Sequence, residues 1–266
     1  IVNESHILSL KYSSRVNKNI PKGSIVDMSV IDYINLPKSY HGRGGVLVGY
    51  RVPINFSRQN VHIDPYLLGY WLGDGKSDNS LISTQDSRVL VYLQKHCFPK
   101  EHPDLYLQYT GAQYDYRINS TFSRTIWGNS LMQGLRKYNL LNNKHIPNAY
   151  KYNVREVQLK LLAGIIDSDG SYHDNCFDIV QKNERLLDDI IFIARSLGFA
   201  AFKSKCEKTC TNSKNGRIKR TYYRSNIYGS GLEKIPVQCI RKKAHARKLI
   251  RDSLNYRIWL EPYRNR

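Results

Sequence analysis

Two stretches of the chain repeat one pattern of apolar, small and acidic positions. The first is LLGYWLGDG, residues 67–75, and the second is LAGIIDSDG, residues 162–170. In the second stretch, apolar residues recur at the three- and four-residue spacing that predicts one face of a helix. Both stretches are far shorter than the ~20 apolar residues of a membrane-spanning helix. The pattern therefore predicts two buried helices in a protein without a membrane partner.

Small residues interrupt both apolar runs. They are Gly69 and Gly73 in the first stretch, and Ala163, Gly164 and Ser168 in the second. A glycine inside a helix costs about 1 kcal/mol relative to alanine, and close contact between two helix backbones can offset that cost. We therefore expect the two helices to pack directly against each other.

Asp74 and Asp169 occupy the same position in the two stretches. A carboxylate is unfavourable at the C-terminal end of a helix, and a second carboxylate alongside raises its pKa further. A divalent cation would supply the missing positive charge. Oxygen ligands favour Mg²⁺, with Mn²⁺ or Ca²⁺ as substitutes for binding. The expected metal site is Asp74 and Asp169, with Gly73 and Ser168 beside them. The alternative is two core helices that each end in an Asp-Gly turn.

LAGIIDSDG closely resembles the motif that names the LAGLIDADG homing endonucleases, and LLGYWLGDG is similar to the degenerate form common in that family's first repeat. The similarity is to the intein-encoded type, such as the endonuclease region of vacuolar ATPase-type inteins. It implies an α+β, pseudo-symmetric fold of two αββαββα halves, residues 61–150 and 151–250. The motif helices would pack together, and two antiparallel sheets would form a saddle over DNA.

The net charge agrees with a polyanionic partner. The 266 residues include 41 Lys and Arg against 22 Asp and Glu, a formal charge of +19. Such an excess is unusual for an enzyme of small metabolites and favours nucleic acid, although a solvated basic surface would give the same count. The 20 tyrosines add groups that can contact sugars and phosphates. We expect a monomer that binds double-stranded DNA.

The five cysteines do not have the spacing of a disulfide framework. Their odd number favours reduced thiols and therefore a nuclear or cytoplasmic location. Cys206 and Cys210 are four residues apart, but no second pair follows, so we interpret them as ordinary residues rather than zinc ligands.

The remaining elements follow from periodicity and from helix and turn signals. Asp64 and Pro65 form an N-cap and first turn for the first motif helix, and Asn183 and Gly198 delimit an amphipathic helix in the second repeat. The other expected elements are a strand in DNSLIST, a helix in SRVLVYLQKHC, a hairpin over residues 104–119 with Thr110-Gly111 in its turn, a helix over 123–141, a strand in YHDNCFDIVQ and a basic hairpin over 202–231.

The two ends of the chain form separate expected regions. Residues 1–60 look β-rich and would form a splicing-domain remnant and a DNA-binding extension. VNESHILSL resembles the second conserved block of inteins, in which His6 would lie near the N-terminal splice junction. The tail begins as a basic helix, and residues 251–266 would supply a C-terminal strand of the same splicing-domain remnant. The chain as given lacks a terminal His-Asn and a Cys or Ser at residue 1, so we do not expect it to splice.

The segments that follow the two motifs, ISTQDSRVL and DIVQKNERLL, show a weaker internal sequence similarity. It puts Gln85 and Gln181 in equivalent places, 96 residues apart. They would touch the water at the metal site, or DNA, or simply end surface strands.

The family resemblance also implies two lysines beside the metal site. The first would be Lys144, in the segment LysHisIlePro, and the second would come from the pair Lys242-Lys243, with Lys243 the better match. Each would orient a water or stabilise charge on the phosphate, although either lysine alone would equally suit a phosphate contact. His145 and His245 are flanking alternatives.

Basic and aromatic side chains on the predicted hairpins are the DNA-binding candidates, because arginine reads guanine edges and lysine mostly holds phosphates. These residues are Arg117, Lys203, Lys205, Lys219, Arg220, Tyr222, Tyr223, Arg224 and Lys242.

The resulting hypothesis is a site-specific homing endonuclease that hydrolyses both strands of a long DNA target with Mg²⁺, using Asp74, Asp169, Lys144 and Lys243. The alternatives are a DNA- or RNA-binding protein of the same fold that has lost cleavage, such as a maturase or regulator, and a trimmed protein-splicing intein. Retention of both aspartates favours the endonuclease.

Overall fold

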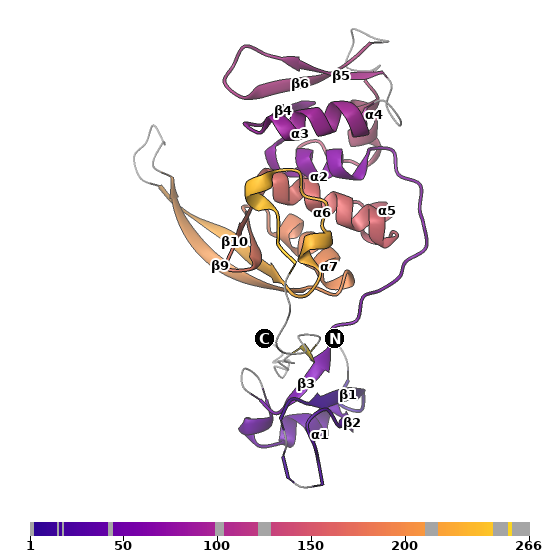
Figure 1. The fold of residues 1–266 in the computed structure, drawn as a ribbon, viewed down its shortest axis with the longest axis vertical. Helices are drawn as coiled ribbons and strands as arrows, with labels where there is room; N and C mark the ends of the chain where they lie inside the picture. Colours follow the sequence, from indigo (N-terminus) through magenta and orange to yellow (C-terminus); the bar gives the residue numbers. More distant parts are fainter. Residues whose placement is uncertain are drawn as a thin grey trace. The chain divides into compact units, whose positions relative to one another are not determined.

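The computed structural model describes residues 3–14, 16–17, 19–41, 45–98, 104–121, 129–210, 218–246 and 255–256. The chain forms two compact units, which are drawn together in Figure 1. One combines Ile1–Val52 with Leu249–Arg266, and the other is Pro53–Lys248. The second unit is therefore inserted in the sequence between two segments of the first.

The first unit is an antiparallel sheet in the order β11-β3-β1-β2. Its small core contains Leu10, Tyr33 and Leu47. The elements of this unit are β1 (Ile7–Tyr12), β2 (Ile25–Ser29), α1 (Val30–Asn35), the 3-10 turn η1 (Lys38–Tyr40), β3 (Leu47–Tyr50) and β11 (Asn255–Tyr256). Because β11 pairs with β3, both ends of the sequence contribute to one sheet.

The second unit begins earlier than the boundary at residue 61 that the sequence suggested. The backbone N–H of Ile54 donates to the carbonyl of Ser196 at 2.8 Å. The side chain of Asn153 both accepts from the N–H of Gln59 and donates to its carbonyl. These bonds attach the segment after Val52 to the second unit.

The second unit contains two similar halves, each built on one motif helix. The first half consists of α2 (Pro65–Asp74), β4 (Leu81–Ser83), α3 (Ser87–Tyr92) with the π-helical turn η2 (Leu93–Cys97), β5 (Leu105–Tyr109), β6 (Asp115–Ser120), α4 (Ser130–Lys137) and α5 (Asn148–Lys151). The second half consists of α6 (Arg155–Asp169), β7 (Gly170–His173), β8 (Cys176–Gln181), α7 (Glu184–Ser196), β9 (Ala200–Cys210), β10 (Ile218–Tyr228) and the 3-10 turns η4 (Leu232–Lys234) and η5 (Ile240–Lys242).

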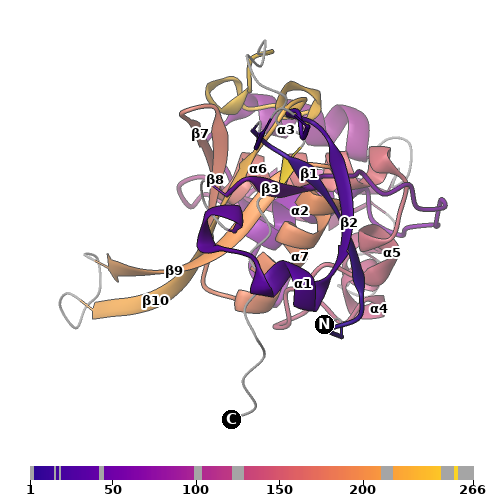
Figure 2. The same ribbon diagram turned by 90° about the horizontal axis from the view of Figure 1, so that it is seen from below.

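The two sheets differ in size. The second half has four strands in the order β7-β8-β10-β9, whereas the first has three, β4-β6-β5. In the first half a single bridge between Gly75 and Ile82 stands where β7 pairs with β8 in the second. Figures 1 and 2 both show the long β9–β10 hairpin reaching past the helices of its unit. The mixture of helices and antiparallel sheets confirms the α+β class.

Most local expectations are confirmed by capping contacts. The side chain of Asp64 accepts from the N–H of Leu67, with Pro65 at the start of α2. The side chain of Asn183 caps α7, and Gly198 follows that helix at φ +89. A left-handed φ of this kind suits glycine because it has no Cβ.

Two local expectations were wrong. YHDNCFDIVQ is a hairpin rather than one strand, because Asp174 and Asn175 adopt φ of 48° and 59° and turn the chain. Asn and Asp tolerate this region better than most residues. The tail forms only the turn η5 and no helix over residues 243–246, and residues 247–250 lie outside the described part of the chain.

The two motif helices cross at their glycines. A Cβ added to Gly69 would lie 2.1 Å from the carbonyl oxygen of Leu161, and one added to Gly164 would lie 2.2 Å from that of Tyr66. Around this contact lies one buried cluster that includes residues from both halves, among them Leu68, Trp71 and Leu162. No helix of the described residues has the length and apolarity needed to cross a bilayer.

We expect Gly164→Ala to destabilise the protein, although alanine is normally the better helix former. The added methyl group would force the two backbones apart, and overpacking of this kind costs about 1–3 kcal/mol. Urea unfolding measures the change. Glu156→Ala, at an exposed position of the same helix, should change the free energy of unfolding by less than about 0.5 kcal/mol. A Gly164→Ala protein as stable as the wild type would contradict the backbone contact.

Candidate active site

The crossing of α2 and α6 brings their C-terminal ends together. A Cβ added to Gly73 would lie 2.0 Å from the hydroxyl oxygen of Ser168 and 3.2 Å from Oδ2 of Asp169. Asp74 is the next residue of α2 and ends that helix. The expected metal residues Gly73, Asp74, Ser168 and Asp169 are therefore neighbours in space, although the two halves of the set are far apart in sequence.

A lysine caps each of these helix ends. Nζ of Lys144 donates to the carbonyl oxygens of Gly73 at 3.1 Å and Gly75 at 2.6 Å. Nζ of Lys242 donates to the three carbonyls of Ile166, Asp167 and Ser168 at 2.7–3.0 Å. A cation at a helix C-terminus is electrostatically favourable, and these bonds fix both ammonium groups close enough to interact with Asp74.

Burial and the charges of neighbouring side chains shift the pKa values of the aspartate and lysine side chains at these helix ends. Desolvation, with the nearby charge of Asp169, raises the pKa of Asp74 to about 6. Desolvation lowers the pKa of Lys144 to about 8, against the opposing effect of the two aspartates. Burial also lowers the pKa of Lys242. The four side chains therefore form one electrostatic cluster, with a carboxylate and an amine that both titrate near neutral pH.

The structure corrects the choice between the paired lysines. Lys242 is almost fully buried, at 6% exposure, and mirrors Lys144 at the other helix end. Lys243 is exposed and makes no contact with the helix end among the described hydrogen bonds. Lys242 is the last residue of the 3-10 turn η5 and its side chain is buried at the site, whereas the chain leaves the turn at Lys243 and that side chain is exposed. His145 bonds to the carbonyl of Asn143 instead, and His245 is exposed.

The structure also corrects the proposed pair of glutamines. Nε2 of Gln181 donates to Oδ2 of Asp169 at 2.6 Å, so this residue does belong to the site. Gln85 is exposed. The bridge of Gly75 with Ile82 and the pairing of Gly170 with Ile179 put Thr84, not Gln85, in the place of Gln181. The helix caps agree with this alignment. Thr84 lies two residues before Asp86, the cap of α3, just as Gln181 lies two residues before Asn183, the cap of α7.

Asp167, close to the end of α6, anchors a neighbouring segment of the chain. Its buried carboxylate accepts from the hydroxyl of Tyr66 and from the backbone N–H groups of Gln238 and Cys239, at 2.7–3.0 Å. It therefore ties the segment that carries Lys242 to both motif helices. Sequence reasoning alone could identify an acidic residue two positions before Asp169, but not its partners, which lie far along the chain.

Strand register divides the predicted DNA-binding residues of the β9–β10 hairpin between two faces. Lys203 forms ion pairs with Glu184 and Asp188 of α7, so it lies on the face that this helix covers. Tyr223 is hydrogen-bonded to Glu184 and lies opposite Lys205, on the same face.

Because side chains alternate along a strand, Lys219 also falls on the α7 face, whereas Arg220, Tyr222 and Arg224 fall on the other. That second face is the one open to a large ligand, so the structure separates the predicted residues into two groups. The sequence could not do so, because it did not show which face α7 covers.

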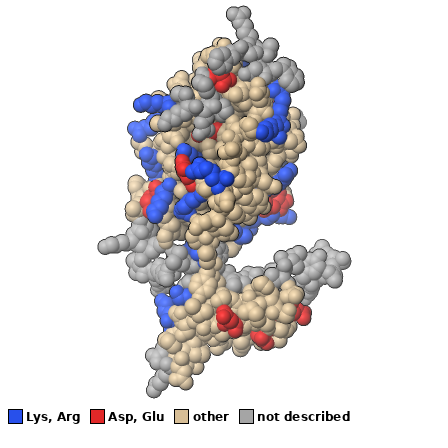
Figure 3. Space-filling view, turned by 90° about the vertical axis from the view of Figure 1, so that its right-hand side faces the viewer, with Lys and Arg blue, Asp and Glu red and all other residues tan. Residues whose placement is uncertain are grey.

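In the other half, Arg117 lies on the corresponding open face of its sheet. The next residue, Ile118, is fully buried, and Arg117 is exposed opposite Gln108 and Leu81. Figure 3 shows Lys and Arg in scattered patches on the visible surface, with fewer acidic residues among them. His6 belongs to the first unit, where it is exposed just before β1.

Residues 145–251 match the family model described as "Homing endonuclease". This region contains α6 with Asp169, the Asp167 anchor and Lys242. This part of the chain is therefore similar to homing endonucleases of the LAGLIDADG type. The first half of the unit, with Asp74 and Lys144 at the equivalent helix end, is its structural counterpart.

A curated relative of this chain is the replicative DNA helicase DnaB of Mycobacterium intracellulare. The two are 29% identical over 156 residues, which is 58% of this chain and 21% of the helicase. The chain thus spans about a fifth of the length of that relative.

Solved structures with some similarity include mesophilic variants of the homing endonuclease I-DmoI and I-DmoI in complex with DNA and Ca. Both are 16% identical, with a TM-score of 0.38, over 62% of this chain and 82% of theirs. I-DmoI in complex with DNA and Mn has 18% identity and a TM-score of 0.37, over 62% of this chain and 89% of that one. Scores of this size do not support residue-by-residue equivalences.

The donor atoms of the homing endonuclease site suit a hard cation. No group of three or more His, Cys, Asp or Glu side chains is placed to bind one ion within the described ranges. The site instead offers two carboxylates and the carbonyl oxygens of Gly73 and Ser168. Each carbonyl keeps a lone pair beyond its bond to lysine. Mg²⁺ is commonly held by one or two carboxylates together with waters and substrate phosphates, so these residues fit it.

Because the pKa of Asp74 is raised, we expect Asp74→Asn to increase the free energy of unfolding in magnesium-free buffer, by an amount that depends on pH. The folded protein holds the Asp74 proton more tightly than the unfolded chain, so this carboxyl costs stability as the pH rises from about 4 to 6. At pH 7.5 the variant should be more stable by on the order of 1 kcal/mol, after allowance for solvent screening. At pH 4.5, where the wild-type carboxyl is mostly protonated, the gain should vanish.

Urea unfolding at the two pH values measures this difference. Added Mg²⁺ should stabilise the wild type and remove the advantage of the variant. If Asp74→Asn increased the free energy of unfolding equally at both pH values, the carboxyl of Asp74 would not have the raised pKa expected at this site.

Proposed function

We propose that this protein is a site-specific endonuclease that hydrolyses both strands of a double-stranded DNA target in a metal-dependent reaction. The observation that carries the proposal is the pair of adjoining helix ends, which bring Asp74 and Asp169 together and are each capped by a desolvated lysine. Two strands must be cut, and two half-sites stand side by side at the helix crossing. The basic surface and the open sheet faces with Arg117 and Arg224 support DNA as the substrate.

Asp74 and Asp169, with the carbonyls of Gly73 and Ser168, would hold Mg²⁺. The chemistry that Mg²⁺ supplies when bound there is charge neutralisation at the scissile phosphate and a more acidic water. Gln181 fixes one oxygen of Asp169 and so orients that carboxylate.

The lysines can act on substrate unequally. An ammonium has three N–H donors. Lys144 donates two of its N–H groups to carbonyl oxygens. Its third N–H can contact a phosphate oxygen or the attacking water. A pKa of about 8 also suits it to proton transfer near neutral pH. Lys242 has carbonyl partners for all three donors, and must give up one of them to contact substrate.

We also propose that the endonuclease unit belongs to an intein. The first unit is assembled from both ends of the chain, with the endonuclease unit inserted between them. The similarity to about a fifth of a DnaB helicase is what an inserted segment within a host protein would give. In this proposal the β-rich unit with His6 derives from the splicing domain.

The first test is cleavage of a randomised double-stranded DNA library with Mg²⁺, beside the Asp169→Asn protein. The wild type should produce discrete double-strand breaks at related sequences, and the variant should lose them because one half-site lacks its carboxylate. A protected stretch of DNA without any break would instead support the binding-only alternative. No protected DNA and no break would overturn the proposal.

The neighbouring lysines provide a matched pair of variants. Lys242→Met should slow the cutting of one DNA strand by about 100-fold, since it removes the ammonium that caps the end of α6. Lys243→Met removes the same charge from an exposed position and should cut almost normally. Strand-specific end labels on a supercoiled plasmid that carries the selected site measure the two nicking rates. The opposite order would restore Lys243 as the active lysine.

A further inference from the structure

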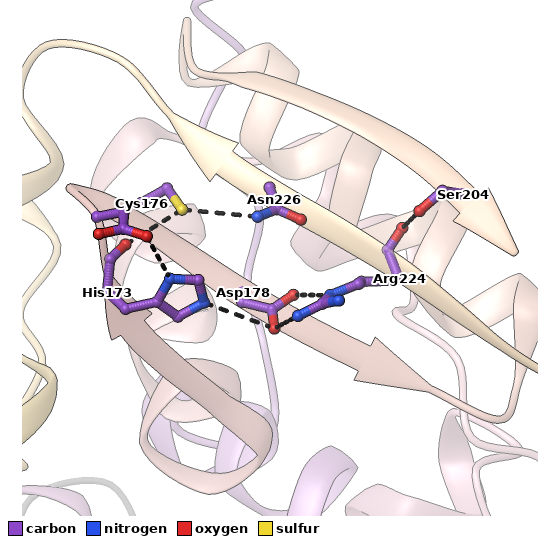
Figure 4. Close-up of polar contacts among 7 residues, drawn as sticks. His173, Cys176, Asp178, Ser204, Arg224 and Asn226 are labelled. Carbon is purple, nitrogen blue, oxygen red and sulfur yellow. Dashed lines mark hydrogen bonds and ion pairs between the residues drawn. The ribbon is translucent and has the colours of Figure 1, made fainter. Parts of the chain in front are cut away.

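Arg224 is held in one orientation on the open face of the four-stranded sheet. Its Nε donates to Oδ1 of Asp178 at 2.7 Å, and its terminal Nη2 donates to Oδ2 at 2.6 Å. Figure 4 shows the two side chains joined by these bonds across β8 and β10. The Asp178 side chain is 9% exposed and that of Arg224 is 44% exposed. A buried carboxylate therefore fixes a guanidinium that still faces solvent.

This arrangement leaves one edge of the guanidinium free for a ligand. Arginine has five N–H groups, and the bonds to Asp178 use one on Nε and one on Nη2. The remaining three lie on Nη1 and the outer side of Nη2. Two parallel donors on those atoms match N7 and O6 of guanine in the major groove. We propose that Arg224, oriented by Asp178, reads a guanine of the bound DNA, and that Asp178 is a positioning residue for this contact.

The position of Arg224 in the sheet favours a base over a phosphate. β10 lies between β8 and β9, so Arg224 is on an interior strand rather than at the rim. Its face is opposite to the one where Lys203 meets α7. A sheet face that covers a groove presents its interior strands to base edges, whereas phosphates lie along the sides of the groove.

Charge gives a second reason. Asp178 cancels the charge of Arg224, so the pair contributes little to the general attraction of DNA. The hydrogen bonds from Arg224 hold the pKa of Asp178 below its usual range, which keeps the carboxylate ionised. A residue needed only for phosphate binding would gain from a free positive charge. An orienting carboxylate is useful where a planar, two-bond contact must be made.

Other groups on this face surround the pair without replacing it. Nε2 of His173 is 3.9 Å from Oδ2 of Asp178, and its Nδ1 is 3.5 Å from Asp174. The amide of Asn226 donates to the sulfur of Cys176. Asp178 thus has a second, more distant basic neighbour, but Arg224 makes the short contacts.

The inference rests on the proposed function, since it assumes that this sheet face binds DNA. The test selects double-stranded DNA from a randomised library with the full chain in Ca²⁺ and scores the base preference at each position. Arg224→Lys keeps the charge but cannot make the planar contact. Asp178→Asn keeps the shape but no longer fixes the guanidinium. Lys203→Gln is the control, because it changes the charge of the same hairpin on the α7 face.

The wild type should prefer guanine at one position by about tenfold or more. Arg224→Lys and Asp178→Asn should both lose that preference at that position only, and enrichment at the other positions shows that the variants fold. Asp178→Asn should also bind unrelated DNA at least as tightly as the wild type, because a negative charge is gone. Lys203→Gln should keep the base profile. A purely structural role of Asp178 would instead weaken binding to every sequence.

A guanine preference that survives Arg224→Lys, or changes spread evenly over the site, would overturn the inference and leave the endonuclease proposal intact. Absence of any DNA binding by the wild type would overturn both.

Discussion

The backbone contact between α2 and α6 is the constraint on which the rest of the endonuclease unit depends. Gly69 and Gly164 let each helix meet the backbone of the other, so the two halves share one core rather than two. The same contact sets the distance between the helix ends. Because Gly73 lies directly against Ser168 and Asp169, both carboxylates are brought into one site without any loop having to fold over it.

That arrangement creates an electrostatic problem, and the structure resolves it with positive charge from both halves. Two carboxylates stand at the unfavourable ends of two helix dipoles. Lys144 and Lys242 reach those ends from segments that follow the sheets, and each lysine is desolvated by the packing that positions it. A divalent cation would complete the neutralisation. The anchor at Asp167 shows that the buried segment before Lys242 is itself held by the motif helix.

The two halves are similar but not equal. The first sheet has three strands, and Thr84 stands where the second half has Gln181. Lys144 donates to two carbonyls and lies over the ring of Trp71, whereas Lys242 donates to three carbonyls. Across the sheets, Arg224 is paired with a buried carboxylate and Arg117 lies opposite Gln108. A pseudo-symmetric scaffold with unequal sites suits a target whose two strands and half-sites need not have the same sequence.

The sequence by itself determined the elements that rest on local signals. The doubled motif, the cap at Asp64, the cap at Asn183 and the Gly198 stop were all predictable, because periodicity and capping act between residues close in the chain. The places of Asp74 and Asp169 at the ends of the motif helices were predictable for the same reason. Only the tertiary structure decided between Lys242 and Lys243, between Thr84 and Gln85, and between the two faces of the β9–β10 hairpin. Each choice depends on strand register and on which neighbour covers a surface, and these are set by contacts between segments far apart in sequence.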